Sequence, residues 1–265
     1  MESLLDNWLW EAYHILEDYL KFATGAFILF YIILKRPLWF RKIQQKMPKL
    51  NDYARDFMYS MITITIFATV SILTLTVLRP YTNVYYDFNE YSTAYYIFTW
   101  VWMFLLHDTW FYWQHRFMHH PKVFKYVHLV HHKSTNPSPW TAYAFHPIEA
   151  VLEVAIIPLI AFTLPVHIGA ISWFFLFQIV YNVYEHLGFE LYPKGFHKTW
   201  IGRWIITSVS HNLHHKRFTG NYGLYFLFWD RAMGTMRADY DQMYEEATER
   251  KSKTNKKQET TPVMN

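Results

Sequence analysis

The stretch from His107 to His132 reads HDTWFYWQHRFMHHPKVFKYVHLVHH, and the interpretation of the whole chain starts from it. Within it, His115 and His119 stand four positions apart, and a second group follows with the offsets i, i+3 and i+4. Side chains at these offsets lie on one face of an α-helix. Each group is therefore predicted to present two or three imidazoles in the same direction, which is how helices offer ligands to a metal.

A third group, far along the chain, repeats the HxxHH spacing of the second. The eight histidines in the three groups are His115, His119, His128, His131, His132, His211, His214 and His215. An isolated histidine such as His14 or His167 is better interpreted as an ordinary structural residue. A low-complexity His-rich tract is not a good description either, because the spacers are aromatic and aliphatic. The groups together predict a polynuclear metal site with nitrogen ligands.

The composition narrows the choice of metal and partner. The chain contains no cysteine, which excludes disulfides, iron–sulfur clusters and thiolate-ligated zinc or haem. Imidazole ligands, with carboxylate or water, suit iron, zinc, copper or nickel. The net charge of +4 is modest and no basic stripe is present, so nucleic acid is not an expected partner.

The same composition indicates a membrane protein. Hydrophobic residues make up 52% of the chain, aromatic residues 21% and charged residues only 17%, unlike an ordinary soluble domain. Four uncharged runs stand out: Phe22–Leu34, Phe57–Leu78, Tyr91–Leu106 and Val154–Tyr184. The second run is long enough to cross a bilayer. The first run is too short to cross it alone and reaches the required length only if the spanning helix also includes the residues just before Phe22. Residues 1–21 are acidic and amphipathic, and they predict an interfacial helix that leads into the first span.

The last run is too long for one straight span. As a single helix it would measure about 46 Å, against about 30 Å for the bilayer core. Pro165, His167 and Gly169 interrupt it in the middle and predict a turn. A hairpin of two short helices is therefore expected, and it returns the chain to the side of the membrane where His107 lies.

The charges between the first two runs give the orientation. Seven cations lie there against two acids, and the cations are Lys35, Arg36, Arg41, Lys42, Lys46, Lys49 and Arg55. By the positive-inside rule this loop is cytoplasmic. Counting spans from it places the histidine groups on the cytoplasmic side as well.

Six strings in this chain carry a family resemblance. They are HDTWFYWQHRFMH from residue 107, HLVHH from 128, NPSPW from 136, FHPIE from 145, HNLHH from 211 and NYGLYFLFWDRAMGT from 221. With them the chain resembles the fatty acid hydroxylase and sterol desaturase superfamily over roughly residues 92–240. The resemblance implies a four-helix integral membrane oxygenase with two iron ions on the cytoplasmic side. It also implies the use of dioxygen and external electrons to hydroxylate or desaturate a lipid chain or a sterol.

The resemblance also assigns roles to single residues. It implies that the eight grouped histidines and His186 are metal ligands, although some relatives have two histidines where this chain has only His186. His107 and His146 match the family, and with Asp108 they are predicted catalytic residues, either as further ligands or as groups that support the ligands. Carboxylates expected to hold ligand imidazoles by their second nitrogen are Asp108, Glu149, Glu153 and Glu185.

The predicted fold is an all-α integral membrane bundle of about four spans, the last two a short hairpin, with a cytoplasmic histidine-rich helical cap. Residues 1–106 are assigned to the interfacial helix and membrane spans. Residues 107–240 form the predicted hydroxylase-like, metal-binding catalytic domain, including the hairpin 154–184. Residues 241–265 form a polar tail that is expected to be disordered.

The predicted function is that of a di-iron oxidoreductase acting on a lipid from the bilayer, with an electron-donor protein of cytochrome or ferredoxin type. Zinc could occupy the site in a purified preparation. The alternatives are a histidine-lined metal transporter or zinc-binding membrane protein, and a membrane haem protein with paired axial histidines. The sequence leaves open the substrate, the choice between hydroxylation and desaturation, the electron donor and the oligomeric state.

Overall fold

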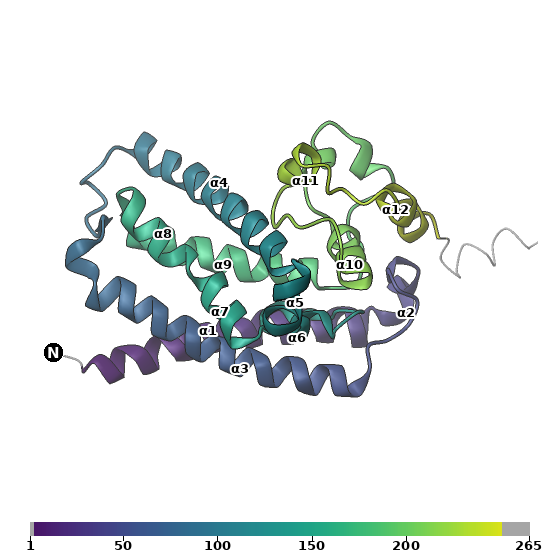
Figure 1. Ribbon diagram of the computed structural model, residues 1–265, viewed down its shortest axis with the longest axis horizontal. Coiled ribbons are helices and arrows are strands. Elements are labelled where there is room, and N and C mark those ends of the chain that lie inside the picture. The colour runs from purple at the N-terminus through teal and green to yellow at the C-terminus, as the bar shows by residue number, and fades with distance from the viewer. Residues whose placement is uncertain (1–2, 251–265) are drawn as a thin grey trace, which may run out of the picture.

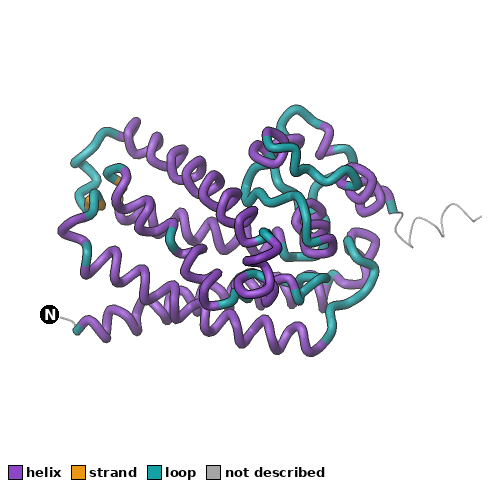
Figure 2. Tube along the Cα trace, in the orientation of Figure 1, coloured by secondary structure: helices purple, strands orange, loops and turns teal. Residues whose placement is uncertain are grey.

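The computed structural model describes residues 3–250, and these fold almost entirely into helices (Figure 1, Figure 2). Four long helices form a bundle: α1 (Leu4–Phe27), α3 (Leu50–Ile72), α4 (Thr93–Met118) and α9 (Ile168–Glu185). Two of them continue as π-helix, α1 into η1 (Ile28–Ile33) and α3 into η3 (Leu73–Val77). A mostly helical fold is thereby confirmed.

Helix α1 packs along α3 for most of its length (Figure 1). The Trp8 indole donates to Thr69 Oγ1 over 3.0 Å, and the Ser71 hydroxyl donates to Glu11 over 2.5 Å. The segment over residues 1–21 that is expected to be interfacial continues without a break into the first apolar run, because Leu4–Ile33 is one continuous helix, and its interfacial position stays a prediction. The polar residues of its first half that suggested an interfacial position are in part satisfied by α3.

The number of membrane spans stays a prediction. Within residues 3–250, one helix, Leu50–Val77, is long and apolar enough to cross a bilayer by itself. Leu4–Ile33 qualifies only together with the short segment Lys35–Arg41, which is bent from it by 80°. That segment comprises α2 (Lys35–Leu38) and η2 (Trp39–Arg41).

The break in the last apolar run lies where the sequence predicts it. Helices α7 (Pro147–Val154) and α8 (Ile156–Thr163) lead to the two-residue strand β2 (Val166–His167), and α9 then runs back toward the cap. Strand β2 pairs in parallel with β1 (Val84–Tyr85), which precedes α4. The turn therefore sits at the end of the bundle away from α10 and α12 (Figure 2).

The apolar core lies between α4, α8 and α9. Met103, Ile160 and Phe174 are fully buried there, one from each helix. Because the three helices share this core, the position of the α4 end that carries the first histidines is fixed relative to α9.

The other end of the molecule is a cap of short helices (Figure 1). Its elements are η6 (Phe196–Lys198), η7 (Gly202–Trp204), α10 (Ser208–Arg217), α11 (Phe228–Ala232) and α12 (Tyr240–Glu249). The short helices α5 (Pro121–Val127) and α6 (Leu129–His132) lie nearer the middle of the molecule in Figure 1, and η5 (Pro139–Tyr143) packs against α1, α3 and α9. The remaining element, η4 (Arg79–Tyr81), lies between α3 and β1.

The sequence-based prediction places the start of the disordered tail, at residue 241, too early in the chain. Residues 240–249 form α12, whose Tyr240, Tyr244 and Ala247 are buried against Leu213 of α10. These three positions follow helical spacing, but the surrounding acids hid the apolar stripe. Residues 251–265 lie outside the described part of the chain.

One cation of the loop after α1 does not face solvent. Lys42 is 0% exposed, and its ammonium donates to Asn136 Oδ1 over 3.3 Å and to the Gly188 carbonyl over 3.2 Å. The Tyr31 and Phe189 rings flank it. Lys42 therefore ties the loop between α1 and α3 to two segments that adjoin the histidine groups.

Candidate metal centre

The first histidine group lies at the end of α4. His115 sits in the last turn of the helix, and His119 is its C-terminal cap, with its backbone N–H bonded to the His115 carbonyl. Their ring centroids are 5.0 Å apart, as the four-residue spacing predicts. The Nδ1 of His115 lies 2.9 Å from the Tyr222 carbonyl oxygen.

The second and third groups are each divided between two clusters. On α10, His211 and His215 are rotated by about 40° from one another, whereas His214 and His215 are about 100° apart. The structure gathers the histidine rings into two clusters, within each of which one ring nitrogen per histidine lies within 4.8 Å of the others. His214 belongs to one of these clusters, and His211 and His215 belong to the other. The prediction that each HxxHH group presents all its rings in one direction is therefore wrong in this respect.

The second group divides in the same way although it is not on one long helix. His128 lies at the junction of α5 and α6, and α6 is a single turn that ends at His132. His128 and His132 join the cluster that contains His214, while His131 joins the cluster that contains His215.

All nine predicted ligands come together in the structure. The five-histidine cluster consists of His115, His119, His128, His132 and His214, and the four-histidine cluster of His131, His186, His211 and His215. Within each cluster, one ring nitrogen from every member lies within 4.8 Å of all the others. His186, which the sequence alone placed in no spaced group, is 2.9 Å from His211 and 3.2 Å from His131, in each case between Nε2 atoms.

In five of the nine clustered histidines, His115, His128, His186, His214 and His215, the Nδ1 atom is held by an oxygen acceptor from outside the clusters. His186, His214 and His215 contact the carbonyls of Asn182, Gly220 and Ser134 at 2.8 to 3.1 Å. His128 Nδ1 lies 2.5 Å from the Glu149 carboxylate. An Nδ1 that donates its hydrogen outward leaves the Nε2 lone pair directed into the cluster, which is the tautomer that binds a metal.

Burial keeps these rings neutral. It lowers the pKa of His115 and of His186 to about 4, and it lowers the pKa of the other clustered histidines well below the usual value, with mutual repulsion as a further cause. The same burial raises the pKa of Glu149 and of Glu185 well above the ordinary carboxyl value. At neutral pH the histidines are therefore ready to act as ligands without first losing a proton.

The donor set fits metal ions. Several buried ring nitrogens find no hydrogen-bond partner within the described residues, among them both nitrogens of His132 and the Nε2 atoms of His119 and His214. Buried polar atoms of this kind normally have a partner, so unpaired nitrogens directed at a common point indicate a cation. Two sets of imidazoles without thiolate suit iron, copper, nickel or zinc.

None of the three residues predicted as catalytic, His107, Asp108 and His146, belongs to either histidine cluster. His107 is 2% exposed, and its Nδ1 lies 3.0 Å from the Tyr225 hydroxyl. Asp108 accepts the backbone N–H groups of Tyr225 and Phe226, so it holds the cap and not a histidine. His146 caps the start of α7 by accepting the Ile148 N–H.

The four carboxylates expected to hold imidazoles differ in role. Glu149 contacts His128, as expected. Asp108 binds backbone, and the Glu185 oxygens are buried without a partner in the described part of the chain. Glu153 lines a small cavity at the clusters together with His115, His131 and Glu185.

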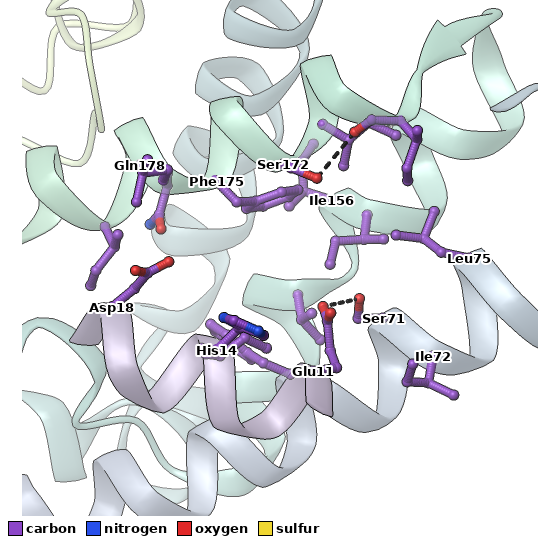
Figure 3. Close-up of a pocket in the computed structure, with 18 of the residues that line it drawn as sticks. Glu11, His14, Asp18, Ser71, Ile72, Leu75, Ile156, Ser172, Phe175 and Gln178 are labelled. Carbon is purple, nitrogen blue, oxygen red and sulfur yellow. Dashed lines mark hydrogen bonds between the residues drawn. The ribbon is translucent and has the colours of Figure 1, made fainter. Parts of the chain in front are cut away.

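A much larger cavity, of about 710 Å³, lies beside the clusters (Figure 3). It is bounded by α1, α3, α7, α8 and α9, and most of its wall is apolar. Phe145 and Glu153 line both this cavity and the small one at the histidines. The wall residues Glu11, His14, Asp18 and Gln178 were not predicted, since their convergence depends on helix packing that no local spacing reveals.

The sequence model of the fatty acid hydroxylase family matches residues 100–235 of the chain, which hold all nine clustered histidines. Among curated proteins, a Delta(7)-sterol 5(6)-desaturase of Gibberella zeae is 31% identical over 160 residues, covering 60% of this chain and 48% of the relative. The chain thus spans about half the length of that relative.

Two further relatives match over more of their length. A Delta(7)-sterol 5(6)-desaturase of Aspergillus fumigatus is 26% identical over 235 residues, 82% of this chain and 73% of its own. The lathosterol oxidase of Rattus norvegicus is 28% identical over 221 residues, 80% of this chain and 72% of its own. No solved structure gives a significant match.

Proposed function

This chain belongs to the fatty acid hydroxylase family, within the wider fatty acid hydroxylase and sterol desaturase superfamily, and from this membership we propose that it is a membrane-bound di-iron oxidoreductase. In this proposal it uses dioxygen and external electrons to hydroxylate or desaturate a lipid. The substrate is an apolar molecule from the bilayer, such as a fatty acyl chain or a sterol-like compound.

One observation carries the proposal: two clusters of neutral imidazoles share the wall residues Phe145 and Glu153 with a large apolar cavity. A substrate in that cavity would lie with one end against the wall that faces the clusters. An apolar molecule could enter laterally from lipid and avoid passage through water.

The five-histidine and four-histidine clusters would each hold one iron. Bound iron supplies the activation of dioxygen and the removal of hydrogen from an unactivated C–H bond. The chain supplies ligation through neutral Nε2 atoms and orientation of the rings through their Nδ1 contacts. Phe111, Phe145 and Leu224 line the small cavity beside the histidines and exclude water from it.

The proposed side of the membrane follows from the loop between α1 and α3. Gln44 of this loop donates to Thr135 and Asn212, which adjoin the second and third histidine groups. The loop and the metal centre therefore lie at the same end of the molecule. If the basic loop is cytoplasmic, as the positive-inside rule predicts, the metal centre is cytoplasmic too.

The proposed electron donor would approach from that side. Exposed cations flank the ligands in the sequence: Lys122 and Lys125 precede His128, Lys133 follows His132, and Lys216 and Arg217 follow His215. Such residues suit an acidic redox protein, because complementary charge speeds encounter. We expect reduction by such a donor to slow as the ionic strength rises.

The transporter hypothesis is not favoured. The clustered histidines lie together at the cap end and not along a path through the apolar helices. Nothing in the donor set singles out zinc. A haem protein would need two axial histidines, and the nine clustered rings go well beyond that.

Metal analysis of the purified chain together with lipid analysis of cells tests the proposal. We expect about two irons per chain, one per cluster, without a haem absorbance band. Cells that express the gene should contain a lipid that differs by one oxygen or two hydrogens from its counterpart in cells without it, and His131→Ala should abolish that difference. Zinc as the resident metal, a haem band, or an unchanged product in His131→Ala would each contradict the proposal.

A further inference from the structure

Helix α4 carries a row of exposed apolar side chains that runs on to the cap. Spaced by four or eight residues, the members of this row are Ile97, Val101, Leu105, Trp113 and Phe117. The cap helix α11 covers the gap in the row, because its Trp229 indole donates to the Thr109 hydroxyl over 3.2 Å and packs edge-on against the Trp113 ring at 5.6 Å. The exposed row of α4 therefore meets the surface of the cap at α11, beside the end of α4 in Figure 1.

The cap surface next to this contact is aromatic and exposed. Its large apolar side chains, here called the aromatic patch, are Trp200, Ile201, Trp204 and Phe228, and Trp200 is 80% exposed. The Leu227 N–H donates to the Trp204 carbonyl over 2.8 Å, so Phe228 lies beside the segment that carries the two tryptophans. Exposed apolar side chains gathered in this way mark a surface that binds a membrane or a protein.

Three arginines lie over exposed tryptophans. The guanidinium carbons of Arg203 and Arg231 lie 5.0 and 5.7 Å from the centroid of the Trp204 ring, and that of Arg116 lies 5.9 Å from the Trp113 ring. Within residues 3–250, none of the three arginines pairs with an acid; the arginine ion pairs there belong to other positions. A guanidinium stacked on a ring keeps N–H groups for an anion, and it matches phosphate well.

The length of α4 places these residues at the edge of a bilayer. A hydrocarbon core of about 30 Å takes about 20 helical residues. A crossing by α4 that begins at its first residue, Thr93, therefore reaches the head-group layer close to Trp113. Tryptophan is enriched in this layer, and arginine reaches the lipid phosphates while its stem stays against apolar surface.

We propose that the aromatic patch, with Arg116, Arg203 and Arg231, is a second membrane contact of this chain. Through it the cap rests on the head-group layer of the adjoining leaflet and binds the phosphates of anionic lipids. The inference rests on the membrane-bound part of the proposed function and is independent of the metals. Lipid suits this surface better than a protein partner does, because the patch continues the exposed row of α4 and its cations have no acidic partner in the described part of the chain.

The contact would fix the cap relative to the membrane. Helix α10 begins at Ser208, four residues after Trp204, and it carries the third histidine group. A docked patch would therefore hold these histidines at a constant distance from the bilayer surface. The patch residues take no part in the chemistry.

Spin labels on the full chain in lipid nanodiscs test the contact. The chain contains no cysteine, so Trp200→Cys and Phe228→Cys each accept a single nitroxide, and both replace exposed side chains. Power-saturation EPR compares collisions with dioxygen, which concentrates in lipid, and with a water-soluble nickel chelate. In nanodiscs of phosphatidylcholine and phosphatidylglycerol we expect both labels to favour dioxygen. The control Gln242→Cys, exposed on α12 among acids, should favour nickel.

Charge variants test the binding of anionic head groups. Arg203→Gln combined with Arg231→Gln should shift both patch labels toward nickel when phosphatidylglycerol is present and change little in phosphatidylcholine alone. A basic residue at an anionic surface is worth about fivefold in such an equilibrium, so the ratio of docked to undocked label should fall severalfold. The matched control removes two exposed cations of α5, by Lys122→Gln with Lys125→Gln, and should leave the ratio unchanged.

The inference is overturned if the labels at residues 200 and 228 meet nickel as readily as the label at residue 242, which is the result expected if a soluble protein covers the patch. Equal effects of the two double variants would overturn it as well. A chain that leaves membranes on alkaline extraction, but whose patch labels still favour dioxygen in nanodiscs, would contradict the membrane-spanning part of the proposed function and leave this inference standing. A membrane-retained chain with two irons and water-exposed labels would do the reverse.

Discussion

His131 and His132 are neighbours in the chain, yet their rings lie 5.8 Å apart at 88° to one another and belong to different clusters. The rings of His214 and His215 repeat this arrangement at 5.9 Å and 87°. Each HH pair therefore serves both clusters at once. The backbone between the two residues fixes the separation of the clusters, and the proposed pair of metals would need such a fixed separation to act together.

The divided pairs predict that neighbouring substitutions remove different metals. His131→Ala should lose the metal of the four-histidine cluster and His132→Ala that of the five-histidine cluster, and each variant should retain about one iron per chain. Both should lose product formation, because the proposed reaction needs both metals. Iron content by mass spectrometry and Mössbauer spectra of the two variants provide the measurement.

The control for these variants is His120→Asn. His120 follows His119 directly, but its exposed side chain caps α5 by accepting the Lys122 N–H, which asparagine can also do. Iron content should stay at the wild-type level. Identical Mössbauer spectra for His131→Ala and His132→Ala would show that the clusters do not bind metals independently.

Glu149→Gln should weaken the metal of the five-histidine cluster without removing a ligand. The Glu149 carboxyl group lies 2.5 Å from His128 Nδ1 and orients that ring, so its replacement by the weaker amide acceptor should lower metal affinity by about 10- to 100-fold. Chelator competition measures the affinity. Glu153→Gln is the matched control, since no hydrogen bond joins Glu153 to a clustered histidine and its metal affinity should be unchanged; an equal loss in both variants would contradict this role for Glu149.

Local spacing was sufficient to find most of the clustered histidines but not their distribution between the two clusters. The offsets in HRFMH, HLVHH and HNLHH identified eight of the nine clustered histidines, because helical periodicity is a property of neighbouring residues. His186 has no such neighbour and came only from the family resemblance. The division between clusters depends on how α4, α6 and α10 meet, and that information is not contained in any one segment.

The same limit explains the errors in the fold. The turn in the last apolar run was predictable because Pro165 and Gly169 act locally. Helix α12 was missed because three buried residues among acids give a weak pattern until Leu213 is known to face them. Lys42 was counted among the cations of a cytoplasmic loop, and its burial was not foreseen because charge alone does not report burial.

The buried Lys42 predicts that stability rises with pH above neutrality. Burial lowers the pKa of its ammonium to about 7, whereas in the unfolded chain the pKa is near 10.5. Between these values the unfolded state binds more protons, so raising the pH favours the folded state by up to about 1.4 kcal/mol per pH unit. Thermal unfolding of wild type and Lys42→Met in detergent between pH 7 and pH 10 measures the slope, and only the difference between the two proteins is assigned to Lys42. Parallel curves would show that the ammonium is not desolvated.

Gly188→Ala should damage the four-histidine cluster from two residues away. Gly188 has φ +71°, and a Cβ there would lie 2.6 Å from Lys42 Nζ and 2.9 Å from the Tyr31 hydroxyl. The left-handed backbone alone costs an alanine about 1–2 kcal/mol, so the control is Gly195→Ala, which has φ +77° but no atom within 4 Å of its Cβ. Both variants should unfold at a lower temperature than wild type, but only Gly188→Ala should also lose iron from the cluster that contains His186, because relief of the contact shifts the segment that carries this ligand. Equal iron content in the two variants would mean that the contacts of Lys42 and Tyr31 with Gly188 support the fold without positioning His186.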